Sequence, residues 1–179
     1  MLDPAHCCLA VVDVQGKLAQ LMVNKEALFK NIQILIRSAQ TLDIPILWCQ
    51  QAPQALGPTV PEIAELLTGV EPIDKTSFSC YGEPRFVQCL QMLGREQILL
   101  CGIETHVCVY QTATDLLAQN YQVTVVTDAV SSRTAENRQI GLDRVAAEGG
   151  ALACTEMVLF ELLRSAEHPR FKEIAKLVR

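Results

Sequence analysis

Apolar runs of strand length alternate with longer segments of helical periodicity along this chain. Strands are predicted at residues 8–13, 44–49, 98–101, 122–127 and 151–154. Helices are predicted at about residues 25–42, 61–67, 83–93, 107–119, 135–148, 155–163 and 170–177, with Asn24 and Thr134 as N-caps and Gly94 as a helix end. Apolar strands that alternate with helices are typical of a parallel sheet covered on both faces. The pattern therefore predicts a single α/β domain over residues 1–179, with a three-layer α/β/α, doubly wound, mainly parallel and Rossmann-like architecture.

Composition and charge narrow the classes of function. Half of the 179 residues are hydrophobic, which is typical of a folded globular chain. The net charge of −5 and the lack of a basic run argue against nucleic acid and anionic membranes as partners. No apolar run approaches the roughly 20 residues of a membrane span, and the apolar stretch ending at Asp13 is typical of a strand and not of a signal peptide. We therefore expect a cytoplasmic protein.

The eight cysteines include no C-x-x-C pair and no Cys/His cluster of zinc-ligand spacing. Small apolar thiols in a reducing compartment are the simple interpretation for most of them, although Cys80 stays open because it lies close to Lys75 in sequence. Cys108 differs, because it falls at the turn from a predicted strand into a predicted helix. Free N–H groups and the helix dipole lower a thiol's pKa there, which makes Cys108 a candidate nucleophile; a buried structural cysteine is the alternative.

Two other polar residues lie at the ends of predicted extended segments. Asp13 ends the first strand, and Lys75 stands among small polar residues after a Pro-containing stretch. A carboxylate, an ammonium and a thiol are the base, the cation and the nucleophile that an activated cysteine needs. Ligands bind at the carboxyl ends of the strands in open parallel sheets, so the predicted fold allows these residues to meet at one edge.

Three motifs occur in order along most of the chain: D-x-Q at residues 13–15, K-x-x-[FY]-S at 75–79 and G-[IV]-x-T-x-x-C-V at 102–109. Together they resemble the isochorismatase-like cysteine hydrolase superfamily. Residues 51–61 and 166–174 further resemble the isochorismatase domain-containing hydrolases within it. The resemblance implies the isochorismatase-like hydrolase fold and a homo-oligomer, either a dimer or a tetramer.

The resemblance also implies roles for individual residues. Asp13 is expected to act as general base for Cys108 and later as proton donor to the leaving group, with Lys75 as the cation that holds both. A cis peptide bond without proline is expected between Ile103 and Glu104. The N–H groups of Glu104 and Cys108 would then form an oxyanion hole.

Three residues are candidates for contact with the substrate: Gln15, Gln50 and Phe78. Gln15 is interpreted as a polar pocket wall or as an exposed loop residue. His106 is expected to be structural or interfacial instead of pairing with Cys108, and the side chain of Glu104 is not expected to be catalytic.

Two departures from relatives define the predicted reaction. Metal-binding nicotinamidases carry D-x-H and a further histidine, whereas residues 48–51 here read Trp-Cys-Gln-Gln, so we expect no metal and no other cofactor. True isochorismatases cleave a vinyl ether and lack the nucleophilic cysteine that this chain has at Cys108. The sequence therefore predicts a metal-independent cysteine hydrolase of the amidase or ureide type that cleaves an amide-type C–N bond of a small molecule. A non-catalytic partner-binding protein and a vinyl ether hydrolase are the alternatives.

Overall fold

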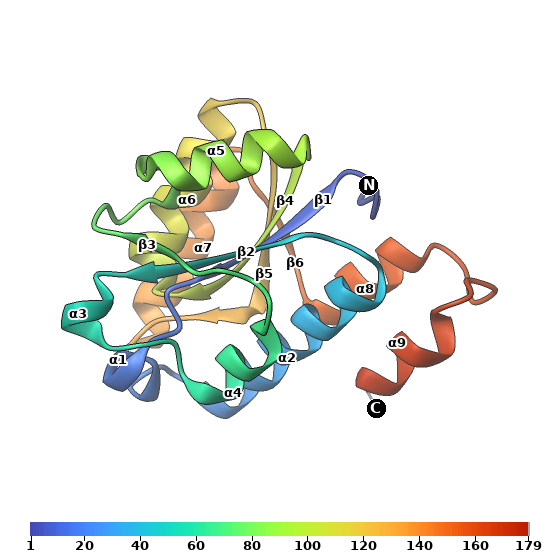
Figure 1. Cartoon of the computed structure of the whole chain (residues 1–179), viewed down its shortest axis with the longest axis horizontal. Helices are drawn as coiled ribbons and strands as arrows, with labels where there is room; N and C mark the ends of the chain where they lie inside the picture. The colour runs from blue at the N-terminus through green and yellow to red at the C-terminus, as the bar shows by residue number, and fades with distance from the viewer. Residues whose placement is uncertain (179) are drawn as a thin grey trace.

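The computed structural model describes residues 1–178, which form an α/β fold around a six-stranded sheet (Figure 1). All strand pairs are parallel, and the strand order is β3-β2-β1-β4-β5-β6. The strands are β1 (Cys7–Val12), β2 (Ile46–Gln51), β3 (Ile73–Lys75), β4 (Gln97–Ile103), β5 (Gln122–Ser131) and β6 (Ala151–Ala153). The predicted doubly wound parallel architecture is confirmed.

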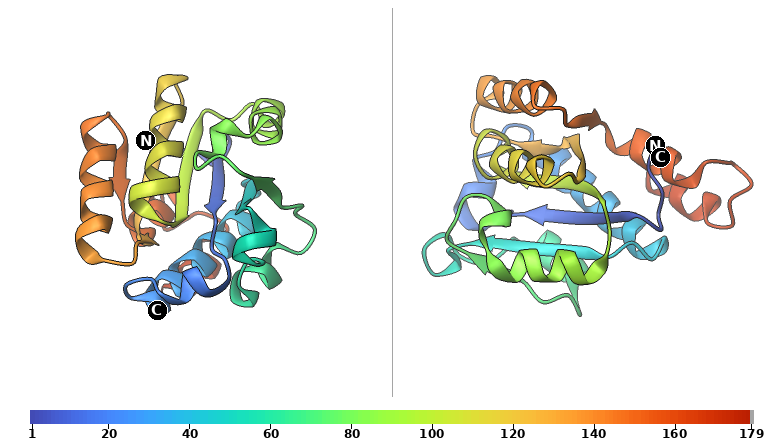
Figure 2. Two further views of the ribbon diagram at one scale, coloured as in Figure 1. Left: turned by 90° about the vertical axis from the view of Figure 1, so that its left-hand side faces the viewer. Right: turned by 90° about the horizontal axis from the view of Figure 1, so that it is seen from above.

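Helices cover both faces of this sheet (Figure 2). The α-helices of the described chain are α1 (Gly16–Gln20), α2 (Lys25–Thr41), α3 (Pro53–Leu56), α4 (Pro61–Ala64), α5 (Pro84–Leu93), α6 (Tyr110–Ala118), α7 (Ala135–Ala147), α8 (Thr155–Leu163) and α9 (Phe171–Leu177). Helices α2 and α8 pack on one face, with α9 against α2, and α5, α6 and α7 pack on the other face. None of these described helices is long and apolar enough to cross a bilayer.

Strand β1 shows why the two layers form. Its side chains point alternately to the two faces. Leu9 and Val11 join the cluster under α2 and α8, whereas Cys8, Ala10 and Val12 join the cluster under α5 and α6. All six residues of the strand are buried, as expected for a central parallel strand covered on both faces.

The helix boundaries confirm two of the three predicted caps. Thr134 Oγ1 accepts a hydrogen bond of 3.1 Å from Asn137 N at the start of α7, and Gly94 ends α5 in the left-handed region at φ +61°. Asn24 is the N-cap residue of α2, but its side chain makes no capping hydrogen bond within the described chain. Its left-handed backbone, at φ +52°, differs from the extended conformation that a capping side chain requires.

Several short elements were absent from the predicted pattern. Strand β3 and helix α1 have three and five residues, too few for a periodicity to show. The helix predicted from residue 107 begins instead as a π-helical turn, η3 (Thr105–Val109), which leads into α6. Cys108 therefore lies in an irregular turn ahead of the regular helix.

Gly102 allows β4 to approach β1 closely beside this turn. Its φ of +119° lies in the region that glycine tolerates, and a Cβ placed there would lie 2.0 Å from the carbonyl oxygen of Val12. The glycine of the third motif thus permits the sheet to bring the turn after β4 against the end of β1.

Candidate active site

The three predicted catalytic residues meet at the carboxyl edge of the sheet. Asp13 directly follows β1, Lys75 is the last residue of β3, and Cys108 lies in η3 after β4. Strands β1 and β4 are neighbours although the chain runs through β2 and β3 between them. The site therefore lies at the topological switch point, where open parallel sheets bind ligands.

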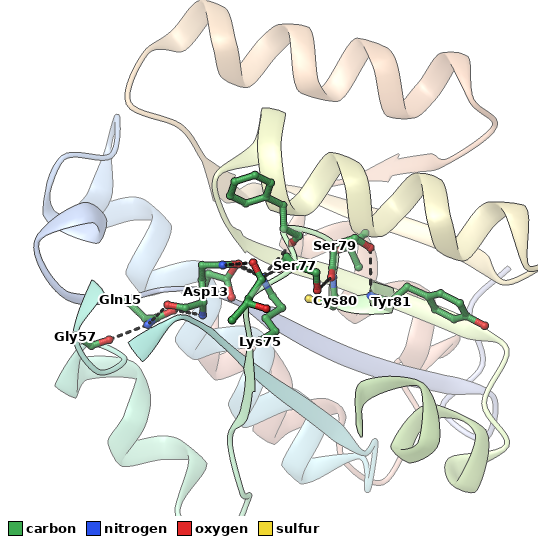
Figure 3. Close-up of polar contacts among 12 residues, drawn as sticks. Asp13, Gln15, Gly57, Lys75, Ser77, Ser79, Cys80 and Tyr81 are labelled. Carbon is green, nitrogen blue, oxygen red and sulfur yellow. Dashed lines mark hydrogen bonds and ion pairs between the residues drawn. The ribbon is translucent and has the colours of Figure 1, made fainter. Parts of the chain in front are cut away.

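Lys75 is a buried cation with a full set of hydrogen-bond acceptors. Its Nζ lies 2.7 Å from Asp13 Oδ2 and 2.7 Å from Gln51 Oε1. It also donates to the carbonyls of Phe78 at 3.0 Å and Ser77 at 3.2 Å (Figure 3). An ammonium has three N–H donors, so these four acceptors saturate it. Its side chain is 0% exposed, which fits a fixed internal cation and leaves no donor for a ligand.

The Asp13 carboxylate has one oxygen held and one oxygen free. Oδ2 accepts from Lys75, while no donor among residues 1–178 makes a hydrogen bond of ordinary geometry to Oδ1. The Cys108 thiol lies close enough for the two groups to alter each other's pKa. A buried carboxylate with an open acceptor position beside a thiol is placed to take that thiol's proton.

The pKa values of the site correct one prediction. Burial raises the pKa of the Cys108 thiol, the Asp13 carboxylate raises it further, and Lys75 acts in the opposite direction. The predicted lowering by the helix end is wrong, because removal of the thiolate from water outweighs it. Burial also raises the pKa of Asp13, against the opposing effects of Lys75 and of the neighbouring Cys108 thiol.

Lys75 remains charged beside these two acids. Burial by itself disfavours the ammonium, but the acidic groups of Cys80, Asp13 and Cys108 outweigh it and raise the pKa of Lys75. The single positive charge of Lys75 therefore faces two acidic groups, Asp13 and Cys108, and burial raises the pKa of each. The burial that raises the pKa of each acid, together with their mutual repulsion, disfavours the ionisation of both at once.

The turn between β4 and η3 contains the cis peptide bond expected between Ile103 and Glu104. No backbone carbonyl of residues 1–178 accepts a hydrogen bond from the Glu104 N–H. The Glu104 side chain is buried, and its Oε2 accepts from Arg133 N at 3.0 Å and from Arg133 Nε at 3.1 Å. Sequence reasoning missed Arg133, which follows β5 and fixes the Glu104 side chain across the strand ends.

The three residues predicted to contact the substrate differ in whether their side chains are already bonded to other parts of the protein. Gln15 is fully buried and bonds through its side-chain amide to the backbone of Gln51 and to the Gly57 carbonyl (Figure 3). Gln50 Oε1 accepts from Thr59 N and Oγ1, both at 3.0 Å, and Gln50 Nε2 donates to Asp74 Oδ1 at 3.1 Å. The structure thus gives both glutamines protein partners in place of an open pocket wall. Phe78 is 54% exposed, while its carbonyl accepts from the lysine of the site.

Two further groups lie near the triad without joining it. His106 Nδ1 lies 2.9 Å from Ser132 Oγ, so this imidazole contacts a hydroxyl at the end of β5. Cys49 and Cys80 are fully buried, and the interaction of Cys80 with Cys49 together with burial raises the pKa of Cys49. Across residues 1–178, no group of three or more His, Cys, Asp or Glu side chains has an arrangement that could hold a metal ion.

The fold places this chain among the isochorismatase-like hydrolases. The sequence pattern of the Isochorismatase domain matches residues 7–157, so the chain belongs to the isochorismatase family. It is 39% identical to Isochorismatase domain-containing protein 2A of Mus musculus, over 98% of this chain and 84% of that protein.

Two solved structures show the same fold over nearly the whole chain. The MAR1 ribonuclease from Caenorhabditis elegans superposes with a TM-score of 0.93 at 36% identity, covering 99% of this chain and 91% of that one. The YcaC gene product from Escherichia coli, described as an octameric hydrolase of unknown specificity, superposes with a TM-score of 0.93 at 25% identity, covering 98% and 88%. The predicted family and three-layer fold are confirmed, and the relatives support a hydrolase.

Proposed function

We propose that this chain is a metal-independent cysteine hydrolase that cleaves an amide-type C–N bond of a small molecule, with Asp13, Lys75 and Cys108 as its catalytic residues. The observation that supports it most is the Asp13 carboxylate. One of its oxygens is held by Lys75 at 2.7 Å, and the other is open beside Cys108. This arrangement lets a thiol with a raised pKa become a nucleophile only as its proton passes to the neighbouring base.

The proposed reaction proceeds in two halves. Asp13 Oδ1 takes the proton of Cys108, and the sulfur bonds to the carbonyl carbon of the substrate. The C–N bond then breaks, and the protonated Asp13 gives its proton to the leaving nitrogen, which departs as ammonia or an amine. Asp13 next takes a proton from water, whose oxygen displaces the sulfur from the acyl group. The acid is released, and the thiol regains its proton from Asp13.

The negative charge that develops on the substrate oxygen needs donors in a site that excludes water. We assign this role to the backbone N–H groups of Glu104 and Cys108. The Glu104 N–H has no backbone acceptor within residues 1–178, and the Glu104 side chain is held away by Arg133. We keep the exposed ring of Phe78 as the proposed side-chain contact for the substrate.

The proposal includes the setting in which the enzyme works. Eight free cysteines, of which six are buried, support a reducing compartment such as the cytoplasm. The octameric relative from Escherichia coli supports a homo-oligomer. A net charge of −5 supports a small-molecule substrate over nucleic acid.

The test is a panel of small amides and ureides incubated with the intact protein, followed by acid quenching and mass spectrometry. We expect at least one substrate to add the mass of its acyl group to Cys108 and to release ammonia or an amine. Cys108→Ala is the matched control and should show neither. A short RNA belongs in the panel because the nematode relative is a ribonuclease. Undiminished turnover in Cys108→Ala contradicts the proposal, and no turnover of any amide favours a non-catalytic binding protein.

A further inference from the structure

The side-chain amide of Gln51 bridges the catalytic lysine and the polypeptide backbone. Its Oε1 accepts from Lys75 Nζ at 2.7 Å, and its Nε2 donates to the carbonyl of Thr76 at 2.8 Å. Lysine is only a donor, so the amide oxygen must face Lys75 and the amide nitrogen must face Thr76. Both ends of the side chain are therefore committed, and the orientation of the amide is fixed by its two partners.

Strand register creates this contact. Gln51 and Lys75 are paired across β2 and β3, each as the last residue of its strand. Paired residues on neighbouring strands point their side chains to the same face. The end of β2 thus supplies an acceptor to a lysine that reaches over it toward Asp13.

Gln15 holds the backbone of Gln51 in turn. Gln15 Oε1 accepts from Gln51 N at 2.6 Å, and Gln15 Nε2 donates to the carbonyls of Gln51 at 3.1 Å and Gly57 at 2.7 Å (Figure 3). The second polar residue of the D-x-Q motif is therefore tied to the strand that carries Gln51. A continuous chain of contacts runs from Gln15 through Gln51 and Lys75 to Asp13.

We propose that Gln51 is a positioning residue that keeps the ammonium of Lys75 charged and directed at Asp13, so that the negative charge can move to Cys108. The lysine stem has four flexible carbons, and its direction depends on the acceptors around the ammonium. Loss of Gln51 Oε1 removes one of the two 2.7 Å contacts that define this direction. For its use in catalysis, the inference rests on the proposed function.

The test needs no substrate, because the probes are iodoacetamide and the lysine itself. In alkylation, the Cys108 thiol gives its proton to Asp13, its sulfur bonds to the methylene carbon of iodoacetamide, and iodide leaves. Its rate at Cys108 is measured by peptide mapping at several pH values on the whole protein. The charge of Lys75 is followed by ¹⁵N NMR of its Nζ, assigned through its loss in Lys75→Met.

Two substitutions at Gln51 and one matched control separate positioning from folding. Gln51→Met keeps the length of the side chain and removes its oxygen acceptor, whereas Gln51→Glu keeps an acceptor and adds negative charge. Gln97→Met is the control, because Gln97, like Gln51, makes several side-chain hydrogen bonds but begins β4 at the opposite edge of the sheet.

In Gln51→Met we expect alkylation of Cys108 at pH 8 to be about tenfold slower and Lys75 to lose its proton at lower pH, since the charged form loses an acceptor. Gln51→Glu should alkylate faster than Gln51→Met and should keep Lys75 charged to a pH at least as high as in wild type. It also carries the test if Gln51→Met does not fold. Wild-type behaviour of Gln51→Met in both measurements, or equal changes in Gln97→Met, overturns the inference.

The two proposals can fail separately. If the alkylation and NMR results are as expected but no amide is hydrolysed, the positioning role stands and the proposed function fails. If an amide is hydrolysed through Cys108 while Gln51→Met behaves as wild type, the positioning role of Gln51 alone is overturned.

Discussion

Lys75 and Asp13 form a buried ion pair at 2.7 Å although their strands are not neighbours in the sheet. Strand β2 lies between β3 and β1, so the two backbones are about 10 Å apart at the usual strand spacing. A long side chain is needed to cross that gap, and Lys75 passes over the end of β2 to do so. The length of lysine is therefore as much a part of the site as its charge.

Removal of either partner of this ion pair should destabilise the protein, mainly because the other partner is left as an unpaired buried charge. We expect Asp13→Asn and Lys75→Met each to lower the free energy of unfolding by about 3–5 kcal/mol. The double variant should lose clearly less than the sum, because no uncompensated charge remains. Urea unfolding followed by circular dichroism measures all three. Arg85→Met, which breaks the exposed pair with Glu71, is the control and should cost under about 1 kcal/mol; additive losses at the buried pair contradict the prediction.

Turnover should depend on Asp13 and Cys108 as one unit. On any substrate found, Cys108→Ala and Asp13→Asn should each lower kcat by about 10³-fold or more, because thiolate formation and its base serve the same step. The double variant should be scarcely slower than either single variant. Steady-state kinetics of the two single variants and the double variant measures kcat for each. If the fold losses in kcat of the single variants multiply in the double variant, the two roles are independent.

Stability should fall steeply at alkaline pH. Burial raises the pKa of the Cys8 thiol from 9.0 to about 12, and burial raises the pKa of Cys101 as well. Above pH 9 the unfolded chain releases these protons while the folded chain keeps them. Each such thiol then lowers the free energy of unfolding by roughly 1.4 kcal/mol per pH unit, and Cys8 does so until about pH 12.

Urea unfolding between pH 8 and pH 11 measures this slope. Cys8→Ala should reduce the loss of unfolding free energy per pH unit by roughly 1.4 kcal/mol, the contribution of one proton. Val12→Ala, a core substitution on the same strand, should lower stability without changing this slope. Equal slopes in wild type and Cys8→Ala would show that this thiol does not contribute.

Gly102 should not tolerate a side chain. In Gly102→Ala the new Cβ would meet the carbonyl oxygen of Val12 at 2.0 Å in a backbone conformation that L residues rarely adopt. We expect a loss of about 3 kcal/mol or more, since β4 and β1 must separate. Gly149→Ala is the matched control: its φ is +95° but no described atom lies within 4 Å of the new Cβ, so strain alone should cost about 1–2 kcal/mol. Thermal unfolding of both proteins tests the difference, and equal losses contradict it.

Activity should not require a metal. The resemblance matches residues 48–51, Trp-Cys-Gln-Gln, to the D-x-H segment of metal-binding nicotinamidases, and amide oxygen is a weak ligand for Zn²⁺ compared with carboxylate or imidazole. Both glutamines are also occupied by protein partners. Purified protein should contain no stoichiometric zinc by elemental analysis, and a chelator should leave turnover unchanged. Loss of turnover on chelation that added Zn²⁺ restores would place this chain in the metal-assisted branch.

The sequence alone determined the layered fold and named the residues that we propose as catalytic. The apolar runs of β1 and β4 are buried on both sides, so their composition reports their place in the sheet directly. The motifs around Asp13, Lys75 and Cys108 follow strand ends, and parallel strands place their carboxyl ends at one edge. Local pattern and strand direction were enough to predict the fold and the edge of the sheet, because neither depends on which distant side chains meet, while the roles of the three residues came from the family resemblance of their motifs.

Only the tertiary structure decided the hydrogen-bond partners and the pKa shifts of those residues. Strand β3 is too short to show a periodicity, and its pairing with β2 is what selects Gln51 over Gln50 as the partner of Lys75. The direction of the pKa shift of Cys108 likewise depends on burial and on Asp13, which is remote in sequence. Desolvation and charge act through space and sum over every neighbour, so no local pattern of residues encodes them.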